Sequence, residues 1–262
     1  IDAFEPTEYW SIDAKLTNVS GKLPFIARFY GSRDGKKIPL ENGEDTDKIV
    51  KELKTSDYAV SKIIKKETKR RPSPPFTTST MQQEASRKLN FTARRTMMAA
   101  QQLYEMGFIT YMRTDSLRIA TVAQNEARSY ISQKFGDKFI PSAPRQYKAK
   151  KSAQDAHEAI RPTYAANSPE KYKDTFKPDQ FKLYRLIWQR FMASQMSDAI
   201  MDTVSAEITT DKYMLKASGS TVKFAGFTTL YVEGKDTEEE KAKKLPVLTE
   251  GQELKLSELK PE

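Results

Sequence analysis

The hydrophobic pattern of this chain changes its period twice, and this change constrains the fold more than any single motif. In residues 9–30, apolar side chains such as Ile12 and Leu16 alternate with polar ones, which is typical of half-buried strands. From Met81 the apolar residues recur at helical spacing, and alternation returns in residues 202–234. Because a strand needs partners in a sheet, we expect both ends of the chain to build one β-rich lobe that a mainly helical lobe interrupts.

The predicted fold class is therefore α+β, with a β-rich lobe that is discontinuous in sequence, called the arch below after the family fold that the resemblance implies, and a mostly helical inserted domain. The proline-rich stretch RRPSPPF (70–76) marks a crossing between the lobes, because residues before proline favour extended backbone. We place the domains at 1–75 (arch, first part), 76–163 (helical insert) and 164–262 (arch, second part).

Helix signals support the insert. They are a capping box at Ser79 and Gln82, a helix from after Thr92 to Gly107, and an apolar stripe through 123–135 that Gly136 closes. A further amphipathic helix is expected over 184–195, in the second part of the β-rich lobe.

The composition limits the chemistry open to this chain. It has no cysteine and a single histidine, which excludes disulfides, thiolate metal sites and cysteine nucleophiles and argues against a histidine metal site. Lys and Arg number 44 against 35 Asp and Glu, and the resulting charge of +9 favours polyanionic partners. No run approaches the ~20 apolar residues of a membrane span, and no signal peptide opens the chain, so we expect a cytoplasmic protein without a membrane partner. Because the chain begins at Ile1 rather than methionine, we expect it to be part of a longer polypeptide.

Positive charge is concentrated in the helical insert. Residues 76–163 contain 14 Lys and Arg against 7 Asp and Glu, a net charge of +7. Arg94 and Arg95 fall in its helical part and are candidate DNA-binding residues, although each could equally be a solvated surface charge. The insert is thus the predicted nucleic-acid-binding face.

The stretch GFITYMRTDS (107–116) contains the first candidate for chemistry. Its β-favouring residues predict a strand, in which Tyr111 and Arg113 would share one face. A phenol is a poor nucleophile unless a cation stabilises its phenolate or a base takes its proton, and Arg113 would supply such a cation while it grips a phosphate. This pair suits a transferase that forms a phosphotyrosine, whereas a tyrosine that only packs at a sheet edge is the structural alternative.

The stretch AQDAHEAIRPT (153–163) contains the second candidate. If it is helical, His157 and Arg161 lie on one face, just before Pro162 ends the helix. Both side chains could then meet an anion, and His157 could move a proton near neutral pH. A capping or buried hydrogen-bonded histidine is the alternative.

Together these segments resemble a known family. GFITYMRTDS, preceded by PPFTTSTMQQEASRKLNFTARRTMMAAQQLYE and followed by AQDAHEAIRPT, is similar to the bacterial type IA DNA topoisomerases. The segments FEPTEYWSIDAKL, LYRLIWQRFMASQM and LPVLTEGQELKL resemble family segments in the same order, so the resemblance covers essentially the whole chain.

The resemblance implies a function for several residues. Tyr111 matches the tyrosine that attacks one DNA strand and forms a 5′-phosphotyrosine, and Arg113 matches the arginine at the scissile phosphate. His157 and Arg161 match positions near the DNA. The family fold is a β-rich arch with the tyrosine on a compact helical domain, and the whole enzyme relaxes negatively supercoiled DNA by passing a strand through the break, associated with the bacterial nucleoid.

The resemblance also implies that part of the enzyme lies outside this chain. In the family a toprim domain binds Mg²⁺ through acidic residues, and no matching motif occurs here, so we expect no metal in this fragment and no cleavage by it alone. Its partners would be single-stranded and negatively supercoiled DNA and the remaining domains of the same polypeptide. The competing hypothesis is a basic DNA-binding or scaffold module in which Tyr111 is structural. A covalent protein–DNA adduct would distinguish the two.

Overall fold

The chain folds as two compact units. The computed structural model describes residues 8–19, 22–147, 157–234 and 245–262. Unit 1 comprises residues 1–68, 201–222 and 240–262, and unit 2 comprises residues 69–200 and 223–239. Both ends of the chain therefore contribute to one unit, as the alternating pattern predicts.

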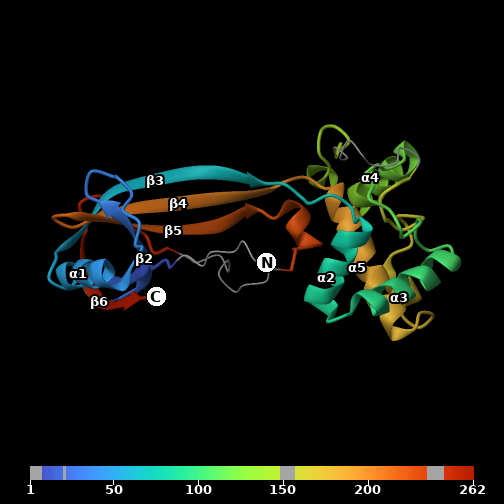
Figure 1. Ribbon diagram of the computed structural model, residues 1–262. Coiled ribbons are helices and arrows are strands. Elements are labelled where there is room, and N and C mark those ends of the chain that lie inside the picture. The colour runs from blue at the N-terminus through green and yellow to red at the C-terminus, as the bar shows by residue number, and fades with distance from the viewer. Residues whose placement is uncertain (1–7, 20–21, 148–156, 235–244) are drawn as a thin grey trace. The chain divides into compact units, whose positions relative to one another are not determined.

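Unit 1 is built on a closed barrel of strands in the order β1-β2-β5-β4-β3-β6. Among the described residues these strands are β1 (Ile12–Asn18), β2 (Phe25–Ser32), β3 (Tyr58–Arg70), β4 (Ala199–Thr209), β5 (Tyr213–Phe224) and β6 (Glu253–Pro261). Strands β3, β4 and β5 run side by side (Figure 1). Strand β6 pairs antiparallel with both β1 and β3 and so closes the barrel.

The alternating residues fill the interior of this barrel. Ile12, Ala14 and Leu16 are fully buried in one core cluster, which accounts for the period of two in their segment. Helix α1 (Gly43–Lys54) begins at the N-cap Asn42 and adds Leu53 to the same core.

Unit 2 is mainly helical. Its described helices are α2 (Thr78–Leu89), α3 (Ala93–Glu105), α4 (Thr121–Phe135) and α5 (Pro178–Ser194), with 3₁₀ turns at Asp137–Phe139, Pro169–Tyr172 and Gly226–Thr229. Helix α5 lies against α2 and α3 (Figure 1), and Tyr130 of α4 meets Trp188 of α5 edge-on. None of the described helices has the length and apolar composition needed to span a membrane.

The structure differs from the expected organisation at two points. Residues 69–75, 164–200 and 223–239, which we assigned to the arch, fall in unit 2. Helix α5 accounts for the largest of these segments, because it buries Leu183, Ile187 and Phe191 in the core of the helical unit. The capping box of α2 is formed by Thr77 and Thr80 rather than by Ser79 and Gln82. The Thr77 and Thr80 side chains satisfy each other's backbone N–H groups, so the helix begins two residues earlier than the pattern suggests.

Candidate active site

The segment that carries Tyr111 is extended but is not a strand, contrary to the expectation from its composition. Its one β-bridge joins Ile109 to Pro162, and residues 110–120 have no regular structure. The side chains nevertheless alternate, since Met112 and its neighbour Thr114 are buried whereas Tyr111 is 40% exposed and Arg113 is exposed. Tyr111 and Arg113 therefore share the exposed side of the segment without belonging to a sheet.

Thr78, the first residue of α2, takes the place of a neighbouring strand on one side of Tyr111. Its backbone N–H donates to the carbonyl of Thr114 (2.9 Å), and its hydroxyl donates to the carbonyl of Met112 (2.7 Å). The same hydroxyl accepts a hydrogen bond from the N–H of Thr114 at 2.9 Å. The backbone on both sides of Arg113 is thus bonded to the N-terminus of α2.

Thr110 makes the same three bonds on the other side of Tyr111. Its N–H donates to the carbonyl of Arg161 (2.9 Å), and its hydroxyl donates to the carbonyl of Ala159 (2.8 Å). The N–H of Arg161 donates to the Thr110 hydroxyl at 3.0 Å. Tyr111 therefore lies between two segments that are each fixed by a threonine.

Two aromatic rings flank the Tyr111 ring. Tyr104, in the last turn of α3, meets it edge-on with centroids 5.4 Å apart, and the His157 ring lies 6.0 Å away at a tilt of 45°. Tyr104 is 41% exposed, so the Tyr104, Tyr111 and His157 rings form a row at the surface of unit 2. The sequence had singled out His157 but gave no signal for Tyr104.

The segment around His157 is extended rather than helical. Residues 153–156 of the expected helix lie outside the described residues, and 157–159 show no helical turn. Ile160 forms a bridge with Phe76, and its N–H donates to the Phe76 carbonyl. The amides of this segment are bonded to other segments instead of along a helix, since the N–H of Ala159 donates to the carbonyl of Arg118 and that of Ile160 to Phe76.

The Arg161 side chain is engaged by its own segment. Its guanidinium is half-buried, pairs with Glu158 at 2.7 Å, and donates to the carbonyls of Pro162 and Thr163. The structure thus brings His157 to Tyr111, whereas the Arg161 side chain holds its own segment together. A role of Arg161 near DNA stays a prediction.

The basic residues of the insert differ in their availability. Arg95 makes two hydrogen bonds of 2.7 Å to Asp179 at the start of α5, and its guanidinium lies over the Phe91 ring. The side chains of Arg94 and Arg113 are exposed and make no ion pair or hydrogen bond to the described residues. Arg113 is therefore an available cation on the exposed side of the segment that carries Tyr111, and Arg94 is an available cation on α3.

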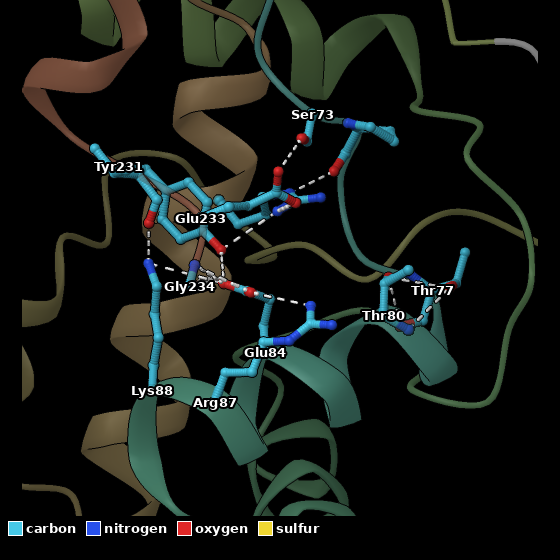
Figure 2. Close-up of polar contacts among 12 residues, drawn as sticks. Ser73, Thr77, Thr80, Glu84, Arg87, Lys88, Tyr231, Glu233 and Gly234 are labelled. Atoms are coloured by element: carbon cyan, nitrogen blue, oxygen red, sulfur yellow. Dashed lines mark hydrogen bonds and ion pairs between the residues drawn. The ribbon is translucent and has the colours of Figure 1, made fainter. Parts of the chain in front are cut away.

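A network of Arg190, Glu233 and Ser73 fixes the segment that precedes α2. Arg190 of α5 is 3% exposed and donates to the carbonyl of Pro74 (2.6 Å) and to the Glu233 carboxylate (2.7 Å). Ser73 donates to the other oxygen of Glu233, as Figure 2 shows. Burial opposes ionisation of Glu233, but the Ser73 bond and the Arg190 charge outweigh it, so the pKa of this carboxyl lies below its usual value.

The middle of α2 holds the segment 231–234 against the helix. Glu84, 2% exposed, accepts hydrogen bonds from the Tyr231 hydroxyl and from the N–H of Gly234 (Figure 2). Lys88 donates to a backbone carbonyl of this segment and lies over the Tyr231 ring. A Cβ at Gly234 would come within 3.2 Å of Arg87 and Lys88, so this approach favours glycine.

We expect Arg190→Met to lower the free energy of unfolding of unit 2 by about 3 kcal/mol, at the low end for a broken buried pair because Glu233 remains 40% exposed. The change leaves the Pro74 carbonyl and Glu233 without their charged donor. Urea unfolding followed by Trp188 fluorescence in a Trp10→Phe background measures this difference. Arg185→Met, an exposed change on the same helix, is the matched control and should stay within about 0.5 kcal/mol. Equal values for the two variants would contradict the prediction.

The carboxylates near Tyr111 bear on where a Mg²⁺ ion could be held. Glu158 is paired with Arg161, and the described part of the chain contains no group of three or more His, Asp or Glu that could hold a metal ion.

Comparison with known proteins places these features in a family. All of the chain, residues 1–262, matches the family model described as DNA topoisomerase. Among solved structures, the full-length topoisomerase I from Thermotoga maritima, in a monoclinic crystal form, is similar, with 33% sequence identity and a TM-score of 0.75. The match covers 100% of this chain and 41% of that one, so the chain spans less than half the length of the solved enzyme.

Proposed function

Because this chain belongs to the bacterial type IA DNA topoisomerases, we propose that Tyr111 is the nucleophile with which a longer protein containing it cleaves one DNA strand. The observation that carries the proposal is the state of the Tyr111 hydroxyl, which has no hydrogen-bond partner among the described residues. Other tyrosines of unit 2, such as Tyr147 and Tyr184, donate to backbone carbonyls. The Tyr111 hydroxyl thus belongs to a side chain on the exposed side of the segment that also carries Arg113.

The proposed reaction exchanges one phosphodiester for another. The phenolic oxygen of Tyr111 bonds to phosphorus while the bond between phosphorus and the 3′ oxygen breaks. The phenol loses its proton and the departing 3′ oxygen gains one, so the products are a 5′-phosphotyrosine and a free 3′-hydroxyl. Because the number of phosphate ester bonds is unchanged, resealing is the reverse step and needs no ATP.

Arg113 is proposed to bind the phosphate that Tyr111 attacks. It shares the exposed side of the segment with Tyr111, and its planar guanidinium can contact two phosphate oxygens at once. Charge held there before the reaction stabilises the crowded transition state without reorganisation. His157, next to the Tyr111 ring, is proposed to contact the DNA beside the break, and Arg94 to contact its backbone.

The proposed substrate is single-stranded DNA, including the unpaired regions of negatively supercoiled DNA. Exposed cations and a row of surface rings suit a strand whose bases are free to stack. Strand passage through the break, followed by resealing, would relax the supercoils. These steps would be performed by the longer protein, in which a domain outside residues 1–262 would supply the acidic residues that bind Mg²⁺.

The direct test is covalent capture. A longer protein containing this chain is incubated with a labelled single-stranded oligonucleotide and Mg²⁺, denatured, and separated by electrophoresis. A labelled adduct that maps to Tyr111 is the expected result. Tight DNA binding without an adduct would instead support the competing hypothesis of a basic DNA-binding or scaffold module.

We expect Arg113→Lys in the longer protein to reduce the rate of adduct formation by about 10²-fold, as for loss of one preorganised electrostatic contact. Lysine keeps the charge but lacks the planar fork. The rate is measured in a single turnover with saturating DNA, and Arg118→Lys, at an exposed position five residues on, is the matched control. An unchanged rate for Arg113→Lys would mean that Arg113 does not act on the phosphate.

A further inference from the structure

The bonds of Thr78 and Thr110 follow one pattern. In each case the threonine N–H donates to the last carbonyl of a three-residue segment, and the hydroxyl bonds to both ends of that segment. Thr78 fixes residues 112–114 in this way, and Thr110 fixes residues 159–161. We call each set of three bonds a threonine clamp. The two clamps are adjacent along the chain, because Thr110 precedes Tyr111 and residues 112–114 follow it.

We infer that the hydroxyls of Thr78 and Thr110 are positioning groups. They hold Tyr111, Arg113 and His157 in the relative positions that strand cleavage requires. The Thr78 clamp fixes the backbone of Arg113 to the start of α2. The Thr110 clamp fixes the segment that follows His157 to the residue that precedes Tyr111. This inference rests on the proposed function, since it assigns the residues that hold the proposed nucleophile.

Threonine suits this task for two reasons. Its hydroxyl can donate one hydrogen bond and accept another, so one atom can hold both a carbonyl and an N–H. Its β-branched side chain has few rotamers, which keeps the oxygen in place. The extended segment around Tyr111 has no continuous strand partner, so these hydroxyls supply fixed bonds where a sheet would otherwise supply them.

The clamps do not line the exposed face that would meet DNA, so their loss should affect rate more than binding. Both threonines are half-buried, and their hydroxyls are engaged with backbone. A shift of about 1 Å in a reacting group can cost about 10²-fold in rate. We therefore expect Thr78→Val and Thr110→Val to slow adduct formation by about 10- to 100-fold, with the Kd for DNA within about twofold of the original.

The experiment compares hydroxyl loss with hydroxyl retention in the longer protein. Single-turnover adduct formation with saturating single-stranded oligonucleotide gives the rate, and fluorescence anisotropy of the same oligonucleotide gives the Kd. Thr78→Ser and Thr110→Ser keep the hydroxyl and should retain a rate within about threefold of the original. Thr96→Val is the control, because the bond of this buried hydroxyl is local to the start of α3, to the carbonyl of the N-cap Thr92.

Each result decides the matter. Original rates for both valine variants would overturn the inference, as would serine variants as slow as valine, since packing rather than the hydroxyl would then matter. Equal slowing by Thr96→Val would also overturn it, because general loss of stability would explain the effect. If either valine variant does not fold, the corresponding alanine variant takes its place. An original protein that forms no adduct would refute the proposed function itself, a result distinct from unslowed variants of an active protein.

Discussion

Replacing Tyr111 by Phe in a longer protein that contains this chain should abolish both the covalent adduct and the relaxation of supercoiled DNA. The substitution removes only the oxygen that would bond to phosphorus. The ring keeps its edge-on contact with Tyr104 and its place beside His157, so folding and noncovalent DNA binding should be nearly unchanged. Tyr104 carries the other phenol of the row, but it does not occupy the position of Tyr111. We therefore expect the rate of adduct formation to fall below detection, by more than about 10³-fold.

The measurement pairs denaturing electrophoresis of the adduct with relaxation of a negatively supercoiled plasmid. Tyr104→Phe is the matched control, since it removes a phenolic oxygen from the adjacent ring and should leave an adduct. More than a trace of relaxation by Tyr111→Phe would mean that another residue attacks the DNA.

Residues 1–262 on their own should bind single-stranded DNA weakly and form no adduct, with or without Mg²⁺. Phosphoryl transfer needs charge stabilised on the leaving and equatorial oxygens as well as a nucleophile. Around Tyr111 the described residues provide Arg113 and His157, whereas Glu158 is occupied by Arg161 and no cluster of acids could hold a metal ion. Binding should weaken strongly with salt, because phosphate contacts release counterions.

This prediction is tested with the labelled oligonucleotide used for the longer protein, which serves as the positive control. Binding is followed by anisotropy across a salt series, and the adduct by electrophoresis. Adding the remaining part of the polypeptide in trans should restore some cleavage if its surfaces dock without the covalent link. A Mg²⁺-dependent adduct with residues 1–262 alone would show that this chain supplies the missing groups itself.

Much of the fold follows from local pattern. The buried alternation of Ile12, Ala14 and Leu16, the N-cap at Thr92 and the helix end at Gly136 were all predicted and are all present. These features depend on residues close in sequence, where side-chain period and backbone preference act directly. The mixed α and β class, with a β-rich unit formed from both ends, followed from the same signals.

The candidate site could be predicted only in part, because its geometry depends on bonds between distant residues. The composition around Tyr111 predicts a strand. The partners of this stretch are Thr78 and the segment 159–161 rather than a continuous strand, so the stretch around Tyr111 has no regular structure. The spacing made Arg161 a candidate for binding an anion. Its pairing with Glu158 instead depends on the conformation of the segment before Pro162, which the spacing does not predict. The threonine clamps join residues 34 and 49 positions apart, and no periodic pattern reports bonds of that kind.

The closure of the barrel by β6 has a consequence for synthesis on the ribosome. Strands β1 and β2 are made first, but β1 has its second neighbour only when β6 emerges, long after the helices of unit 2. During that interval the open edge of β1 can pair with any available strand, including one from another nascent chain. Because segment 69–200 is continuous, the helical unit can form most of its core while the chain is still being synthesised. We infer that closure of the barrel is a late step of folding, and the one most exposed to incorrect strand pairing.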